Sequence, residues 1–189
     1  PARTPAGTLF DCTGLCRSRG VPHRPRAGRQ PRPGSGVAIE GDLIAIGAPT
    51  DSRVADSAGA VYLFRRRDET WELEEILAPP DLARDEYFGF DIDIDAGRIA
   101  VGSANAQGKP GRVFVYERRL GVWEYEVIEP HNGVAADWFG TEVYLDGDLL
   151  AVGATGVDGD AREQGGVYLY RHTAAGWELE EELIPLDPI

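Results

Sequence analysis

Acidic side chains at short, regular spacings are the residues of this chain best suited to chemistry. Asp91, Asp93 and Asp95 form an Asp-x-Asp-x-Asp motif, which is how an oxygen-ligand calcium loop begins. Asp158 and Asp160 stand on either side of a glycine in a second acidic segment. Carboxylate oxygens are ligands that calcium prefers. The sequence therefore offers these five aspartates as candidate metal ligands, with calcium as the candidate cofactor.

Both acidic motifs also have a purely structural interpretation. Ala96 follows the first motif where the sharp turn of a calcium loop requires glycine, and no glutamate closes the loop. On a strand, a spacing of two would place the three aspartates on one face, where their mutual repulsion requires solvent or a cation. The second motif is equally typical of a simple turn. Metal ligation and a solvated strand face both stay open as explanations.

Catalysis finds little support in the other residue types. The three histidines, His23, His131 and His172, stand at unrelated places, and no serine lies in a Gly-x-Ser-x-Gly motif. Carboxylates are numerous, but nothing singles out one pair for acid–base chemistry. We therefore expect a protein that is not an enzyme.

Several other charged or reactive residues have a structural explanation. Arginines end one segment and glutamates begin the next beside each of three tryptophans, so cross-strand ion pairs are expected. Glu86 and Asp137 each stand two residues before a Phe-Gly pair, and we expect them to fix the chain there as hydrogen-bond acceptors. Cys12 and Cys16 lack a second Cys or His pair that would complete a metal site, so they are interpreted as incidental thiols.

Charge divides the chain into two unequal parts. Its 189 residues are 42% hydrophobic and 27% charged, as in a folded protein. Residues 1–36 carry a net charge of +6, and residues 37–189 carry −19. The acidic part would repel phosphate groups, which argues against nucleic acid and anionic membrane surfaces as partners. No apolar run reaches the roughly 18 residues of a membrane helix, so no membrane insertion is expected.

Three copies of one unit of about 50 residues follow the basic segment. Residues 88–104 (FGFDIDIDAGRIAVGSA) align without a gap with residues 139–155 (FGTEVYLDGDLLAVGAT), and residues 36–50 (GVAIEGDLIAIGAPT) form an earlier copy. Each copy continues into an apolar motif and then into an acidic motif that begins at a tryptophan. These tryptophans are Trp71, Trp123 and Trp177, which are 52 and 54 residues apart.

Every motif within a unit has the pattern of a β-strand. Hydrophobic residues alternate along the first strand, and a two-residue turn at 40–41 or 146–147 leads into the second. The second and third strands are apolar on both faces, as in the middle of a sheet, whereas the tryptophan strand is polar on one side, as at an edge. The sequence predicts an all-β fold of three four-stranded antiparallel sheets, which would be blades of an incomplete β-propeller.

The Phe-Gly pairs at 88–89 and 139–140 and the Gly-Ala-Pro at 47–49 give these units a resemblance to FG-GAP repeats. Such repeats form the blades of the integrin α-chain propeller and of many bacterial secreted proteins, and the likeness is closest to the bacterial type. The resemblance implies an extracellular or cell-surface protein that binds a protein or glycan ligand through loops on one face. It also implies a calcium loop between the first two strands of a blade, near the first acidic motif.

The functional expectation is a non-catalytic binding or scaffold module, similar in role to an adhesion domain. Two alternatives remain open. One is an accessory propeller of a larger secreted hydrolase, and the other is a propeller with its own metal or carboxylate site.

The expected organisation is a basic tail over 1–35, followed by blades over 36–87, 88–138 and 139–189. The tail has no strand pattern, so we expect it to be disordered or to derive from a shifted reading frame. A closed propeller has roughly 4–8 blades, so three are too few. Because the chain starts at Pro1 and contains no methionine, we expect a piece of a longer protein. Further blades of that protein, or self-association, would complete the ring.

Overall fold

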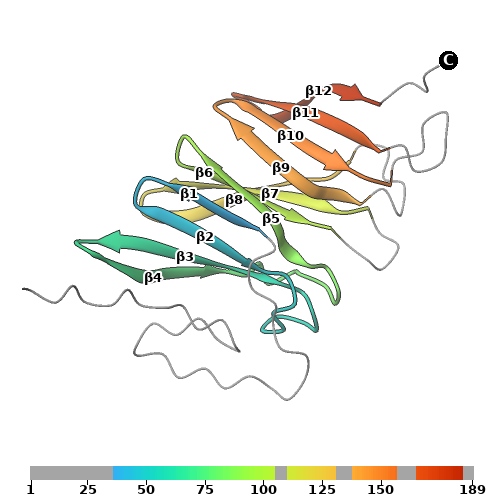
Figure 1. Ribbon diagram of the computed structural model, residues 1–189. Coiled ribbons are helices and arrows are strands. Elements are labelled where there is room, and N and C mark those ends of the chain that lie inside the picture. Colours follow the sequence, from blue (N-terminus) through green and yellow to red (C-terminus); the bar gives the residue numbers. More distant parts are fainter. Residues whose placement is uncertain (1–35, 105–109, 131–137, 157–164, 185–189) are drawn as a thin grey trace, which may run out of the picture.

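The computed structural model describes residues 36–104, 110–130, 138–156 and 165–184. Within these ranges the chain is all-β, with three four-stranded antiparallel sheets and no helix. The strands of each sheet pair in chain order, and the sheets lie one after another as the blades of an incomplete propeller (Figure 1). The predicted fold class is thus confirmed. No helix capable of spanning a membrane occurs in the described ranges.

The three sheets are called blades 1, 2 and 3. Blade 1 consists of β1 (Val37–Glu40), β2 (Leu43–Ala48), β3 (Ala60–Arg67) and β4 (Thr70–Leu77). Blade 2 consists of β5 (Phe88–Asp95), β6 (Arg98–Ser103), β7 (Arg112–Arg119) and β8 (Val122–Ile128). Blade 3 consists of β9 (Phe139–Asp146), β10 (Leu149–Ala154), β11 (Gly166–Thr173) and β12 (Gly176–Leu183).

The first hairpin turn of a blade lies one residue later than the sequence indicated. The sequence favoured a turn at 146–147, but Asp146 still pairs with Leu149, so the two turn residues are Gly147 and Asp148. The same shift occurs in blade 1, where the turn is at 41–42. Gly147 has a φ of 56°, and a positive φ at the first turn position is what a type II′ hairpin requires. In blades 1 and 3 glycine therefore takes the first place in the turn, whereas in blade 2 the turn is Ala96–Gly97, with glycine second and a positive φ at both residues.

A hydrophobic core fills each seam between blades. Phe88 and Phe139, the phenylalanines of the two Phe-Gly pairs, are fully buried. Phe88 contacts Phe114 edge-on, with 5.0 Å between ring centroids, and Phe139 contacts Tyr168 in the same way at 5.3 Å. Blades 2 and 3 turn their larger side chains towards the blade before them. Towards the blade after it, each blade turns smaller ones, such as Ala45, Val61 and Leu63 in blade 1 and Ala100, Val113 and Val115 in blade 2.

Glycine allows the backbones of neighbouring blades to touch. A Cβ atom added to Gly102 on β6 would lie 2.0 Å from the carbonyl oxygen of Gly140 on β9. A Cβ atom added to Gly47 on β2 would lie equally close to the carbonyl oxygen of Gly89 on β5. The glycines of the Gly-Ala motif of blade 1 and the Gly-Ser motif of blade 2 thus receive the Phe-Gly segment of the next blade. The Phe-Gly part of the repeat motif therefore contacts the Gly-Ala or Gly-Ser part of the preceding blade.

Replacing Gly102 by alanine tests this close approach. The added methyl group would force blades 2 and 3 apart, so we expect the free energy of unfolding to fall by about 1–3 kcal/mol or more. Urea denaturation of dilute protein measures it. Gly153→Ala is the matched control, because Gly153 takes the same place in blade 3 and its added Cβ would come no closer than 3.2 Å to any neighbour. Equal losses in the two variants would contradict the assigned contact.

Candidate functional site

The three aspartates of the first acidic motif form a row of hydrogen bonds between blades. We call Asp91, Asp93 and Asp95 of β5 the carboxylate ladder. Asp91 accepts from the backbone N–H of Val143 at 2.9 Å, and Asp93 accepts from that of Leu145 at 2.7 Å. Asp95 accepts from the backbone N–H of residue 147 at 2.6 Å. Three alternate residues, from Val143 on β9 to Gly147 in the following turn, thus each donate to one carboxylate of blade 2.

The ladder has a physical cause in the position of β9. This strand is the first of its blade and pairs only with β10 within the sheet, so every second N–H points out of the sheet. An unpaired N–H at a buried edge is costly. Because side chains on a strand also repeat every two residues, three carboxylates can match three such N–H groups. Blade 1 makes one contact of this kind, in which Glu40 accepts from the N–H of Gly97 at 3.2 Å.

The ladder does not gather its carboxylates around one point. Residues two apart on a strand are separated by about 6.6 Å, whereas a calcium ion needs six to eight oxygens within about 2.6 Å. Each aspartate instead directs one oxygen to a different N–H group. In the described ranges no group of three His, Cys, Asp or Glu side chains is placed to hold a metal ion. Calcium binding stays a prediction, and Asp158 and Asp160 lie outside the described residues.

Replacing Asp93 by alanine tests the ladder. The N–H of Leu145 would lose its acceptor at the seam, so we expect the free energy of unfolding to fall by about 1–3 kcal/mol. Glu124→Ala serves as control, since the Glu124 side chain is exposed on the outermost strand of the same blade. The loss caused by Asp93→Ala should be the same with added calcium and with a chelator, since Asp93 binds a backbone N–H in this arrangement. A loss only in the presence of calcium would instead assign Asp93 to a metal site.

A second cluster of charged groups lies in the loop between β2 and β3. Asp51 is buried and accepts two hydrogen bonds from the Arg53 guanidinium, at 3.0 and 3.1 Å. It also accepts from the Arg53 backbone N–H at 2.9 Å and from the Tyr62 hydroxyl at 2.8 Å. The cation of Arg53 lies over the Tyr62 ring. This loop network therefore fixes the start of the loop against the third strand of blade 1.

Burial and the neighbouring arginine shift the pKa of Asp51 in opposite directions. Burial alone would raise the pKa of Asp51, but the hydrogen bonds from Arg53 and Tyr62 and the charge of Arg53 outweigh it, so the pKa lies below its ordinary value. Burial, together with the charge of Asp51, raises the pKa of Tyr62 to about 12. Asp51 is thus an ionised acceptor and Tyr62 a neutral donor across the whole neutral range. Neither group is poised to exchange protons near pH 7.

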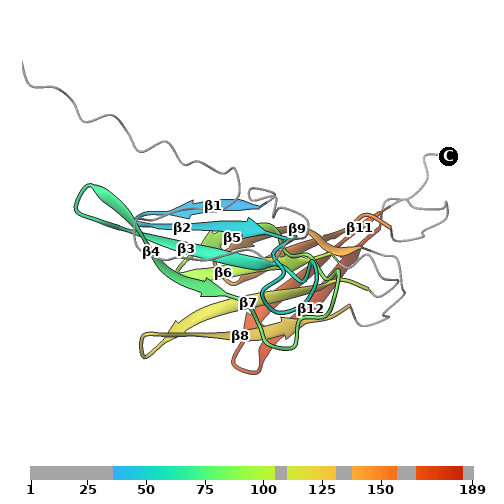
Figure 2. The same ribbon diagram turned by 90° about the horizontal axis from the view of Figure 1, so that it is seen from below.

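The loop between β4 and β5 is joined to the loop of blade 1. The N–H of Asp85 donates to the carbonyl of Asp56 at 2.8 Å, and Arg84 forms an exposed ion pair with the Asp56 carboxylate. Glu86 is buried and accepts from Arg112 of β7, as the predicted hydrogen-bond acceptor before Phe-Gly. Both loops lie at the end of the blades opposite the hairpin turns (Figures 1 and 2). We call this the loop end. Asp137, the partner of Glu86 in that expectation, lies outside the described residues.

Replacing Asp51 by asparagine tests the loop network through its pH dependence. A pKa that is lower in the folded chain gives stability that is complete above the ordinary value of 3.8 and is lost as pH falls through the folded value. At pH 7 we expect the variant to lose about 1–3 kcal/mol of unfolding free energy. The difference from the parent chain should shrink in acid below pH 3.8.

Asp56→Asn is the control for this prediction, because it removes a carboxylate from the same loop whose side chain is exposed. We expect a much smaller loss there. A gap between the Asp51 variant and the parent that stays constant down to the acid transition would contradict the assigned ion pair.

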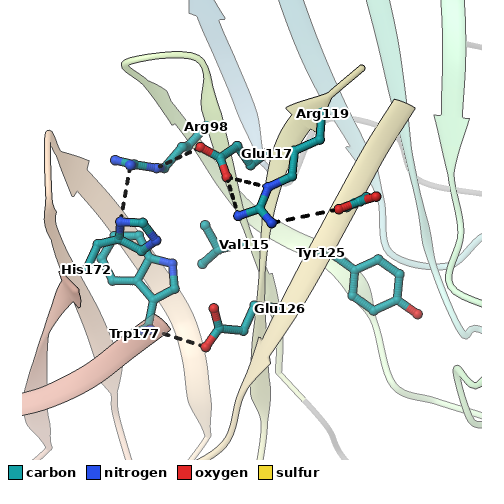
Figure 3. A pocket seen from close by; sticks show the side chains of 9 residues that line it. Arg98, Val115, Glu117, Arg119, Tyr125, Glu126, His172 and Trp177 are labelled. Carbon is teal, nitrogen blue, oxygen red and sulfur yellow. Dashed lines mark hydrogen bonds and ion pairs between the residues drawn. The ribbon is translucent and has the colours of Figure 1, made fainter. Parts of the chain in front are cut away.

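A groove of about 140 Å³ lies between blades 2 and 3, beside the β7–β8 and β11–β12 hairpin turns (Figure 3). Arg98 crosses it, with hydrogen bonds to Asp148 at 3.1 Å and to the Nδ1 atom of His172 at 3.2 Å. The His172 and Trp177 rings contact each other at a tilt of 51°, and the backbone N–H of Trp177 donates to Glu126 at 3.2 Å. The groove is smaller than the roughly 300–1,000 Å³ of ligand pockets. Its charged groups therefore act as a polar seam between blades, which the sequence pattern did not indicate.

Comparison with known families agrees with the repeat structure. Residues 33–64 and residues 124–170 match the model of the FG-GAP repeat. The first match covers β1, β2 and most of β3, and the second runs from β8 through β11. No curated protein matches the chain.

Proposed function

Since this chain is an FG-GAP repeat protein, we propose that it is a non-catalytic binding module whose loop end engages a protein or glycan ligand. FG-GAP proteins are commonly extracellular, and we propose an extracellular or cell-surface location for this one as well. The blades serve as the scaffold, and the loops between them form the contact surface. No chemical change of the ligand is part of this proposal.

The observation that carries the proposal is the rigid anchoring of the described loops at the loop end. Asp51, Arg53 and Tyr62 hold the start of the blade 1 loop, and the backbone carbonyl of Asp56 ties the same loop to the N–H of Asp85 in the linker before blade 2. A loop fixed before binding loses little conformational entropy when a ligand arrives. Carrying binding residues on loops above a rigid scaffold is also the general arrangement of such surfaces.

The chemistry of the buried acids supports binding over catalysis. Asp51 and Glu86 are each held by an arginine, and the ladder aspartates each accept a backbone N–H. A general acid or base needs a pKa near the working pH, and the pKa of Asp51 is shifted in the opposite direction. Above these anchors, exposed charges such as Arg84 remain available to a ligand.

A charge reversal at the loop end tests the proposal. The full chain is screened on arrays of glycans and of extracellular proteins, and each ligand found is measured again with Arg84→Glu. We expect this variant to bind at least about tenfold more weakly, since the exposed guanidinium lies within the contact surface. Arg119→Glu is the matched control, because Arg119 is similarly exposed on the hairpin between β7 and β8 at the opposite end. It should bind like the parent chain.

Incubating the chain with the same ligands distinguishes binding from catalysis. A glycan or peptide recovered after long incubation should have an unchanged mass. Cleavage that disappears in an Asp or Glu variant would overturn the non-catalytic assignment. Equal weakening by the Arg84 and Arg119 variants would show that the loop end is not the contact surface.

A further inference from the structure

Blade 3 exposes the same side chains that blades 1 and 2 bury against the following blade. Val61 and Val113 are fully buried, whereas Val167, at the same register position on β11, is 37% exposed. The pairing partners of these three valines repeat the contrast. They are Leu77 and Ile128, each 5% exposed, and Leu183, 46% exposed. We call this side of blade 3 the rear face.

Two further features of the rear face have a function only when another blade packs on it. Gly153 takes the place of Gly47 and Gly102, but no carbonyl of a following blade lies where its side chain would be. Glu142 and Asp146 take the places of Asp91 and Asp95 in the carboxylate ladder. Both side chains are exposed, and no hydrogen bond or ion pair connects them to another described residue. The rear face thus has both features found where blades pack together. One is a glycine that leaves room for a backbone carbonyl, and the other is a pair of carboxylates that can accept backbone N–H groups.

Blade 1 carries the complementary surface, which we call the front face. Val37 and Ile39 on β1 are 61% and 63% exposed. Their counterparts are Ile92 and Ile94 in blade 2 and Val143 and Leu145 in blade 3, all buried against the preceding blade. β1 is also an edge strand that pairs only with β2, with the same register as β9 on β10. Its outward N–H groups at Val37, Ile39 and Gly41 therefore correspond to those that the ladder binds on β9.

We propose that the rear face of blade 3 binds the front face of blade 1 of a second copy of this chain. The rear face and the front face are both exposed on one chain. They correspond to the two surfaces that pack together between blades 1 and 2 and between blades 2 and 3. In this arrangement Glu142 accepts from the N–H of Val37, and Asp146 accepts from that of Gly41.

Such an interface joins different surfaces of the two copies, and interfaces of this kind form a ring when the rotation closes. Two copies joined twice in this way contain six blades. That number lies within the roughly 4–8 blades of closed propellers. The proposed self-association is thus a head-to-tail dimer.

Sedimentation equilibrium of the full chain tests the proposal. The expected species has twice the chain mass of 20.5 kDa. Ile39→Lys alters the front face and Val167→Lys the rear face, and each would bury an unpaired ammonium group in both seams of the dimer. We expect each variant to raise the dimer dissociation constant by about 100-fold or more. Val122→Lys is the matched control, since Val122 is 62% exposed on the middle blade and away from both faces. It should leave the dimer intact.

Mixing the two variants separates head-to-tail pairing from any symmetric contact. The Ile39 variant keeps its rear face and the Val167 variant keeps its front face, so one seam of a mixed dimer is intact. We expect the mixture to form dimers at concentrations where each variant alone is a monomer. Circular dichroism of each variant verifies that the blades are folded. A monomeric parent chain, an open polymer, or a mixture that fails to associate would overturn the proposal.

Discussion

The structure depends on how a blade satisfies the outward N–H groups of the strand that begins the next one. An edge strand offers every second N–H away from its own sheet, and water cannot reach these groups once blades pack together. Blade 2 supplies acceptors from Asp91, Asp93 and Asp95, so β5 and β9 lie side by side without pairing as a sheet. The apolar cores on either side set the distance between blades. The carboxylates set the position of one blade along the other.

Much of the fold follows from the sequence because each repeat carries the same local signals. Alternating hydrophobic residues, the turn glycines and the tryptophan strand define four strands without knowledge of the neighbouring blade. Asp-Gly predicts a turn at 146–147, one residue earlier than the observed turn at 147–148, because the dipeptide does not reveal which residue takes the positive φ. The ladder could not be predicted, since its donors belong to a strand 52 residues later in the chain. The aspartate spacing was a correct signal of a shared strand face, but the sequence does not show what that face meets.

The arginines form ion pairs both within a blade and between neighbouring blades. Arg65 pairs with Glu74 across β3 and β4, as the charge pattern predicted, and Arg171 pairs with Glu180 across β11 and β12. Arg118 reaches Glu74 from the neighbouring blade, and Arg98 reaches Asp148 in the other direction. These contacts between blades were invisible in the sequence because they join positions about one repeat apart. Among the described residues, these arginines are thus placed along strand pairs and between blades.

The carboxylate ladder binds backbone amides, which every residue except proline possesses. It therefore holds its neighbour without regard to the side chains on that strand. The glycine contact is more selective, because the carbonyl it receives belongs to Gly89 or Gly140, whose own positive φ and close contacts favour glycine. A blade can change most of its sequence and still be bound by the carboxylates of its neighbour, provided that its first strand remains extended and in register. Repeats joined in this way are free to diverge after duplication. The loops of one blade can acquire a new specificity while the seams that hold the array together stay the same.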